Sequence, residues 1–199
     1  MSFDSPIEGQ TPLDDISGLL DRSIQTSSQL NMAEAENIRK VILKYLASKP
    51  TKRMAKFDLA WIRKLHEEMF GDVWAWAGAW RTSQVNIPTA SDPVLIEVDL
   101  QNMLDNLHSW SSFDWPLIEQ AAHLHHRAVC VHPYPNGNGR WSRMLANIWL
   151  KLHGEGVVIW PEQIIGSEST IRTEYLGALR LADGGDFQAF IELHSRYQE

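Results

Sequence analysis

The chain has little cysteine and no surplus of positive charge. Cys130 is the only cysteine among 199 residues, so no disulfide can form within the chain, and a reducing compartment fits. Lysine and arginine together number 18 against 25 aspartates and glutamates, which gives a formal net charge of −7. Because a nucleic-acid surface needs basic side chains to neutralise phosphates, this balance argues against a general nucleic-acid-binding protein.

Long apolar runs are also lacking. No stretch approaches the ~20 apolar residues that cross a bilayer, and residues 1–6 have neither the basic nor the apolar region of a signal peptide. The remaining composition is ordinary for a globular protein, with 44% hydrophobic and 22% charged residues. We therefore expect a cytoplasmic protein that contacts no membrane, and one domain is the default at this length.

Helical spacing of apolar residues dominates the chain after a polar start. Residues 1–30 are rich in Ser, Thr, Asp, Gly and Pro and are predicted to form an N-terminal arm, followed by one domain over residues 31–199. Asn31 and Glu34 form a plausible N-terminal cap for the first helix, and Asp58 and Gly71 bracket the second. Further helices are predicted at 100–110, 116–129, 141–152, 171–182 and 187–194.

The spacing of apolar residues changes from helical to alternating within residues 83–98. Apolar and polar residues alternate in two short runs, at 85–87 and again at 94–98, with a turn-rich stretch between them. Such alternation predicts a β-hairpin. An exposed pair of strands has unpaired amides and carbonyls, which invite strand addition by a partner.

Residues 132–143, with the sequence HPYPNGNGRWSR, combine a histidine, a glycine-rich turn and two arginines. Apolar residues recur at helical spacing after the turn, so the glycines lie where a helix begins. The first amides of a helix have no intrahelical partner and carry partial positive charge, and glycine lets an anion approach them closely. Gly137, Asn138 and Gly139 are therefore predicted to cradle phosphates.

The flanking side chains strengthen this interpretation. Arg140 and Arg143 fall on one side of the first helical turn and can clamp further phosphate oxygens. His132, just outside the turn, is placed to take a proton from a group that attacks the bound phosphate. A glycine loop that only joins two helices would not explain the presence of all three side chains.

The same stretch resembles the signature of the Fic family, His-x-Phe-x-(Asp/Glu)-Gly-Asn-Gly-Arg-x-x-Arg. Two positions depart from it, because Tyr134 replaces Phe and Asn136 replaces the acid. The resemblance covers roughly residues 30–195 and implies a mainly α fold, a helical bundle with one β-hairpin flap. Fic proteins typically transfer AMP from ATP to a Tyr, Thr or Ser hydroxyl of a target protein, so the resemblance implies a protein adenylyltransferase.

The resemblance also implies roles for residues outside the signature. The predicted hairpin corresponds to the flap that pairs with the backbone of the target protein, so Val85, Asn86 and Ile87 would dock the target. Tyr175 and Asp183 resemble the positions that line the adenosine pocket.

The departure at Asn136 affects the metal. The signature acid of the family holds the Mg²⁺ that bridges the ATP phosphates, whereas Asn136 offers only a neutral oxygen and is expected to be a weak Mg²⁺ ligand. Weak Mg²⁺ binding with normal chemistry, a different phosphate-containing donor and low activity all remain open. Gly139 stands where the phosphorylating toxin branch usually carries Lys, which favours adenylylation. The alternative is a catalytically weak or phosphotransfer-type toxin, or a binding module of a toxin–antitoxin pair.

Two other groups of residues suggest a different kind of site from phosphate binding. His123 and His126 share a helix face, and together with His132 they could supply three zinc ligands. Cys130 lies two residues before His132, which suggests a Cys/His nucleophile pair, but no third orienting group stands out. Both patterns are weaker than the phosphate-binding pattern.

The resemblance also bears on how the predicted activity would be inhibited. Many Fic proteins are held inactive by a helix whose Glu pairs with the second arginine of the signature. Glu8 and Glu36 come near that pattern, but neither fits it, so a separate protein could supply the Glu. The chain also resembles small Fic proteins called mobile mystery protein B, which lie beside a helix-turn-helix partner on mobile elements. The resemblance therefore implies an inhibitory, antitoxin or helix-turn-helix partner.

Overall fold

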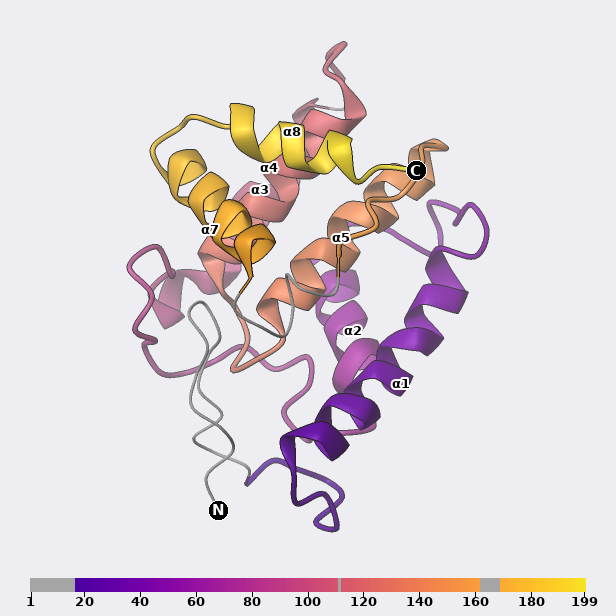
Figure 1. Ribbon diagram of the computed structural model, residues 1–199, viewed down its shortest axis with the longest axis vertical. Helices are drawn as coiled ribbons and strands as arrows, with labels where there is room; N and C mark the ends of the chain where they lie inside the picture. Colours follow the sequence, from indigo (N-terminus) through magenta and orange to yellow (C-terminus); the bar gives the residue numbers. More distant parts are fainter. Residues whose placement is uncertain (1–16, 111, 162–168) are drawn as a thin grey trace.

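A computed structural model describes residues 17–110, 112–161 and 169–199. Within these residues the chain is mainly helical, as predicted, and the helices form a bundle (Figure 1). They are α1 (Ser27–Tyr45), α2 (Leu59–Phe70), α3 (Ile96–Trp110), α4 (Leu117–Val131), α5 (Asn138–His153), α7 (Thr170–Asp183) and α8 (Gln188–Arg196), with a 3₁₀ turn η1 (Pro93–Leu95) before α3. None of the helices described here is long and apolar enough to cross a membrane.

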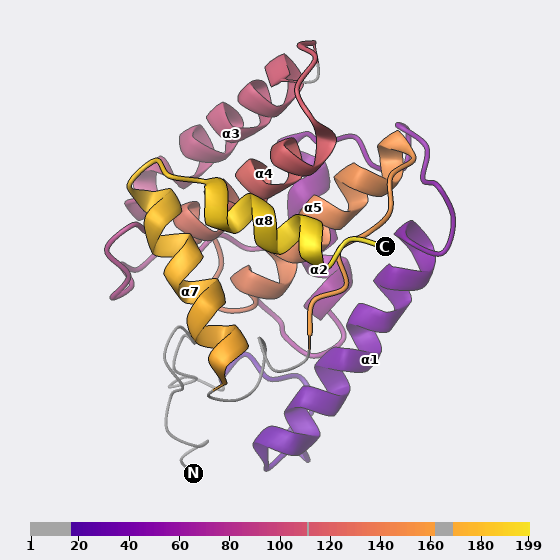
Figure 2. The ribbon, with the colours of Figure 1, turned by 45° about the horizontal axis from the view of Figure 1, so that its top comes forward.

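The helices α4 and α5 pack against each other at the centre of the bundle (Figures 1 and 2). On one side α1 packs on α2, and α2 packs on α5; on the other side α7 packs on α8, and α8 covers α4. The main core lies among α1 to α5, and its largest fully buried side chains include Trp74, Trp141, Tyr45, Tyr134, Phe57 and Phe70. A smaller core around Tyr175, Phe190 and Leu193 holds α7 and α8 to α4.

The start of α1 differs from the prediction, whereas the limits of α2 agree with it. Thr26 caps α1, because its side chain accepts the amide of Gln29 while the Gln29 side chain accepts the amide of Thr26. The predicted cap at Asn31 and Glu34 is therefore wrong, and Glu34 is a buried residue inside the helix. In α2 the carboxylate of Asp58 accepts the amide of Trp61 at 2.7 Å, and the helix ends at Gly71 as predicted.

The predicted hairpin at 83–98 is wrong in its second half. The side chain of Asp92 accepts the amide of Val94, Pro93 occupies the first helical position, and η1 leads directly into α3. Helical spacing prevails because Ile96 continues into the buried face of α3, whereas Val94 is 82% exposed. Residues 82–92 form an irregular loop, hereafter the 82–92 loop, and no strand occurs in this part of the described chain.

Candidate active site

The turn between α4 and α5 is built on two left-handed residues. His132 ends α4 with φ 49° and ψ 57°, and Gly137 precedes α5 with φ 80°. Only glycine fits the second position, since a Cβ there would lie 2.7 Å from the ring of Phe70 and 3.2 Å from Nε2 of His66. The prediction that the glycines lie at the start of a helix is confirmed.

His132 is an uncharged, buried base. Its side chain is 8% exposed, and burial, followed by the nearby charge of Arg81, lowers the pKa of His132 to about 4. At neutral pH the ring is therefore unprotonated, which is the state that a general base requires. The left-handed backbone of His132 places this side chain at the very end of α4.

Arg81 ties the 82–92 loop to the turn. Its Nε donates to the carbonyl of His132 at 2.7 Å, and its backbone amide donates to the carbonyl of Pro133 at 2.9 Å. The remaining guanidinium nitrogens donate to the carbonyls of Ser83, at 2.9 Å, and of Ser91. A single buried arginine thus holds both ends of the loop beside His132.

The interior of the turn is braced by Tyr134 and Asn138. Tyr134 is fully buried, its ring stacks on His66 with 3.5 Å between centroids, and its hydroxyl donates to the carbonyl of Ile62. The side chain of Asn138 accepts the amide of Tyr134 at 2.9 Å and donates to its carbonyl at 2.8 Å. The side chain of Asn138 is thus bound to the turn, and its backbone amide is the group that can meet an anion.

His66 supports the turn from α2. The amide of Gly78 donates to Nδ1 of His66 at 3.0 Å, so Nε2 carries the proton and donates to the carbonyl of Asn136 at 3.1 Å. Burial lowers the pKa of His66 to about 3, which keeps the ring neutral. The side-chain oxygen of Asn136 accepts the amide of Gly137 at 2.6 Å. A single lone pair on that oxygen is left for a metal.

Arg140, the first arginine of the motif, is paired with a carboxylate from α1. Its guanidinium forms an ion pair with Glu34, and it lies 4.8 Å from the centre of the Phe70 ring. Glu34 is 3% exposed, and it also accepts the indole N–H of Trp74 at 2.7 Å. From the sequence, Glu34 was predicted only as part of a helix cap and not as a partner of the motif.

Arg143, the second arginine, forms no ion pair with a carboxylate in the part of the chain that the structure describes. Its guanidinium borders the backbone of Gly139, where a Cβ would lie 3.7 Å from Nη1. It lies close to Tyr175, and burial, which outweighs the favourable interaction with Tyr175, lowers the pKa of Arg143. The start of α5 therefore lies beside an arginine whose charge is not neutralised by a described carboxylate.

A chain of hydrogen bonds holds Tyr175, the residue beside this arginine. The hydroxyl of Tyr175 donates to Nε2 of His125 at 3.1 Å, and Nδ1 of His125 donates to Nε2 of His194 at 3.1 Å. Nδ1 of His194 donates to the carbonyl of Phe190 at 2.7 Å, which fixes both tautomers. Burial lowers the pKa of both histidines, to about 4 for His194. Tyr175 thus lies beside Arg143, and its predicted contact with adenosine stays a prediction.

Asp183 lies at the end of α7 against two side chains of α4. Its Oδ1 is 2.9 Å from Nε2 of His126 and 3.4 Å from Sγ of Cys130. Burial, followed by the charge of Asp183, raises the pKa of Cys130 to about 12, so the thiol stays protonated and is a poor nucleophile. This geometry does not support the nucleophile pair of Cys130 with His132. The role of Asp183 in an adenosine pocket stays a prediction.

The zinc set suggested by the histidine-rich stretch is not assembled. The ring of His123 stacks on Phe187 with 3.6 Å between centroids. Within the described residues, the side chains close enough to hold one metal ion are His126, Cys130 and Asp183. His126 is therefore the single member of the predicted set that this group retains.

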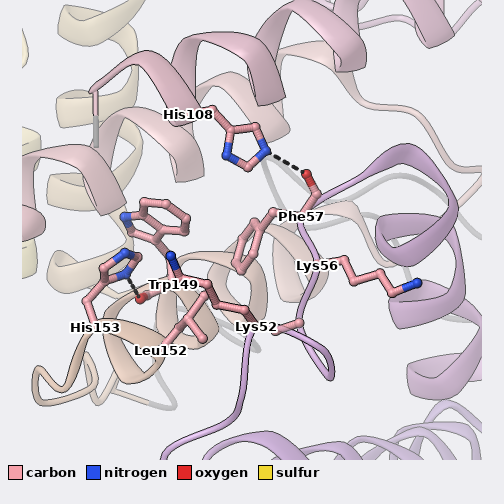
Figure 3. Close-up of a pocket in the computed structure, with 8 residues that line it drawn as sticks. Lys52, Lys56, Phe57, His108, Trp149, Leu152 and His153 are labelled. Carbon is pink, nitrogen blue, oxygen red and sulfur yellow. Dashed lines mark hydrogen bonds between the residues drawn. The ribbon is translucent and has the colours of Figure 1, made fainter. Parts of the chain in front are cut away.

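A small pocket of about 110 Å³ lies at the other end of α5 from the motif (Figure 3). Trp149 and His153 of α5 and Phe57 line it, and His108 of α3 bonds the carbonyl of Phe57 at 3.2 Å. Small-molecule sites generally measure roughly 300–1,000 Å³. The pocket is thus too small for a nucleotide and is remote from His132.

Comparison with known proteins finds a family match around the motif. The model of the Fic/DOC family matches residues 56–150, which include α2 to α5 up to Leu150. The protein adenylyltransferase fic-1 of Caenorhabditis briggsae is 35% identical over 127 residues, covering 62% of this chain and 23% of that protein. The chain thus spans about a quarter of the length of the curated relatives it matches.

Solved structures agree in fold. The structure of Fic-1 from Caenorhabditis elegans, residues 134–508, matches with a TM-score of 0.58 and 29% identity, covering 70% of this chain and 40% of that chain. The BepC protein of Bartonella tribocorum, solved with bound AMPPNP, matches with a TM-score of 0.65 and 17% identity, covering 97% and 95% of the two chains. At that identity the second match shows the fold alone.

Proposed function

We propose that the region matched by the Fic/DOC family, residues 56–150, is the core of a domain that transfers AMP from ATP to a Tyr, Thr or Ser hydroxyl of a target protein. The observation that carries the proposal is the turn at 132–137, which places the unprotonated His132 beside the start of α5. The protein adenylyltransferases among its relatives support the same activity.

In this reaction the phosphates of ATP lie on the first amides of α5. The amides of Asn138 and Gly139 have no intrahelical acceptor, and the helix dipole favours an anion there. Arg143 borders the same space and can meet phosphate oxygens with two parallel hydrogen bonds. We propose Arg143 as the main phosphate-binding side chain, because Arg140 is already neutralised by Glu34.

The transfer itself is a displacement at phosphorus. The hydroxyl oxygen of the target forms a bond to the α-phosphorus while the bond to the β-phosphate oxygen breaks, and pyrophosphate leaves with the electron pair. The hydroxyl proton passes to the neutral ring of His132. The 82–92 loop, held beside His132 by Arg81, is the segment on which we propose that the target docks, through Val85, Asn86 and Ile87.

Mg²⁺ fits the proposal as a partner of the nucleotide. The residues at the turn offer it one neutral oxygen, that of Asn136, so the phosphates would supply most of its ligands. When bound, Mg²⁺ supplies charge that neutralises the phosphates of the donor. Asn136 would hold this ion weakly.

Regulation by a partner also belongs to the proposal. Glu36 is exposed and pairs with Arg39, and Glu8 lies outside the described residues. A carboxylate from an inhibitory or antitoxin partner, such as the helix-turn-helix protein that the resemblance implies, would complement Arg143. The single, buried cysteine suits a cytoplasmic setting for such a pair.

The test is labelling of proteins in a cell lysate by an ATP analogue tagged on its adenosine, with mass spectrometry to locate the added AMP. A positioned base contributes ~10²–10⁴-fold to rate, so His132→Ala should lose that much labelling while ATP binding measured by calorimetry persists. His123→Ala, on the same helix, is the matched control. Labelling at the parent rate by His132→Ala would overturn the assignment of the base, and ATP binding without any labelling by the parent protein would favour a binding module.

A further inference from the structure

Three side chains from two helices, none of them proposed as a catalytic group, converge on one point. His126 and Cys130 are one turn apart on α4, and Asp183 is the last residue of α7. Their potential ligand atoms, one nitrogen, one sulfur and one oxygen, all lie within 4.8 Å of one another. His126 and Cys130 are buried, whereas the side chain of Asp183 is one-third exposed, so the group opens to solvent on one side.

The spacing of these atoms matches the ligands of a tetrahedral metal ion. Nε2 of His126 is 2.9 Å from Oδ1 of Asp183, and Sγ of Cys130 is 3.4 Å from both atoms. Zinc bonds of ~2.0–2.3 Å at tetrahedral angles separate nitrogen from oxygen by about 3.3 Å and sulfur from either by about 3.5 Å. A change of a few tenths of an ångström thus converts this cluster into a three-ligand site.

The arrangement differs from that of a catalytic Cys–His–Asp triad. In a triad the two nitrogens of the imidazole face different partners, the nucleophile on one side and the acid on the other. Here Nε2 of His126 is the nearest ring nitrogen both to Sγ of Cys130, at 3.4 Å against 3.9 Å for Nδ1, and to the carboxylate of Asp183. Convergence of all three atoms around one nitrogen is the geometry of ligands around a common centre.

We propose that His126, Cys130 and Asp183 bind one Zn²⁺ ion, with solvent as the fourth ligand. A thiolate and a carboxylate neutralise the two charges of the ion, so the partly buried complex carries no net charge. The thiol proton leaves to solvent as the sulfur–metal bond forms. Thiolate and imidazole select zinc over magnesium, so this site is chemically distinct from the Mg²⁺ that accompanies the nucleotide.

The ion would join α4, which ends in His132, to the C-terminal end of α7. The carbonyls at the end of α7 carry partial negative charge, which adds to the attraction for a cation. Because the ligands lie on two helices, metal binding stabilises the folded chain over the unfolded chain. Thermal stability therefore reports on the site independently of any transferase activity.

Cobalt is the probe of choice, because Cys130 is the only cysteine in the chain and any sulfur-to-cobalt charge-transfer band must come from it. Metal-free protein should bind one equivalent of Co²⁺ with that band, Zn²⁺ should remove it, and excess Mg²⁺ should not. Zn²⁺ should also raise the melting temperature of the parent protein. Absence of the charge-transfer band at one equivalent of Co²⁺ would overturn the proposal.

Variants separate this site from adventitious binding. Cys130→Ser should abolish the band, and Asp183→Asn, which keeps the shape of the side chain, should weaken Zn²⁺ binding at least about tenfold. His123→Gln, a neighbouring histidine outside the trio, should bind Zn²⁺ like the parent. Unchanged Zn²⁺ affinity and an unchanged zinc-dependent rise in melting temperature in both Cys130→Ser and Asp183→Asn would also overturn it.

Discussion

The two arginines of the motif lie three residues apart on α5, yet they are held in different ways. Arg140 points to a buried carboxylate, Glu34, whereas Arg143 lies beside Tyr175 and forms no ion pair with a described carboxylate. A neutralised guanidinium contributes mainly to structure, while one that keeps its charge can bind an anion. The difference indicates that one arginine secures the start of α5 and the other serves the phosphates.

Lowering the pH should disturb the surroundings of both arginines, and we expect it to cause the largest loss of unfolding free energy. His66 lies behind the turn and His194 ends the chain of hydrogen bonds that holds Tyr175 beside Arg143, and burial lowers their pKa values to about 3 and about 4. Both pKa values lie below 6.5, the ordinary value for histidine, so the unfolded chain takes up protons at higher pH than the folded chain. The contribution of these neutral rings to the free energy of unfolding is therefore complete above pH 6.5 and is lost as the pH falls toward the folded-state pKa values. Each histidine should cost about 1.4 kcal/mol per pH unit in that window.

Urea unfolding at pH 7.5, 6 and 5 measures this loss, which should reach on the order of 4 kcal/mol at pH 5 for the two histidines together. His66→Gln should lower the parent stability at pH 7.5 but reduce the slope with pH. A free energy of unfolding that stays flat from pH 7.5 to pH 5 would show that these rings are not buried in neutral form.

Replacement of the arginines tests the comparison directly. Arg143→Lys keeps the charge but loses the planar fork, so it should weaken ATP binding on the order of 10–100-fold and AMP binding much less. The matched variant Arg140→Lys should change ATP affinity by less than about threefold. Calorimetric titration of both nucleotides into both variants measures the difference. Equal losses of ATP and AMP in Arg143→Lys would place Arg143 in a structural role.

Removal of the buried carboxylate addresses the other arginine. Glu34→Gln keeps an acceptor for Trp74 but leaves Arg140 without its counter-charge, and should cost about 1–3 kcal/mol of unfolding free energy. The control is Glu36→Gln, because Glu36 forms an exposed, solvent-screened pair with Arg39, so its loss should leave the free energy of unfolding nearly unchanged. If Glu34→Gln instead left stability unchanged and tightened ATP binding, Arg140 would be a phosphate ligand that Glu34 masks.

The smallest expected effect concerns Asn136, in the turn that precedes both arginines in the sequence. Asn136→Asp adds a charged oxygen ligand and should lower the Mg²⁺ concentration for half-maximal transfer by about threefold to tenfold. Titration of Mg²⁺ against protein labelling in the two proteins measures the shift. An equal or higher Mg²⁺ requirement in the variant would mean that the oxygen of residue 136 serves only the amide of Gly137.

Local patterns in the sequence were sufficient for the centre of the molecule. The glycines of the motif, the helical repeat after them and the cap at Asp58 are all signals within a few residues, and each appears in the structure where it was predicted. The error at 94–98 arose because Val94, Ile96 and Val98 alternate as a strand does, while Asp92 and Pro93 provide a stronger helix start.

Contacts between distant residues could not be predicted in the same way. Glu34 and Arg140 are 106 residues apart, and Asp183 lies 57 residues beyond His126. Composition and periodicity place such residues on helices, but only the packing of the helices decides which side chains meet. The sequence therefore indicated His132 and Arg143 as candidates, but it did not show that Glu34, His66 and Arg81 contact the motif.

The attachment of the 82–92 loop has a consequence for how acceptor choice can change over time. Arg81 binds the carbonyls of Ser83 and Ser91 next to His132, so both ends of the segment between these serines are held in place. Its length and side chains can vary without moving the groups that handle the donor. Under the proposed function, drift toward new acceptors would accumulate in these few residues, and a grafted segment between Ser83 and Ser91 is a practical route to redirect the protein.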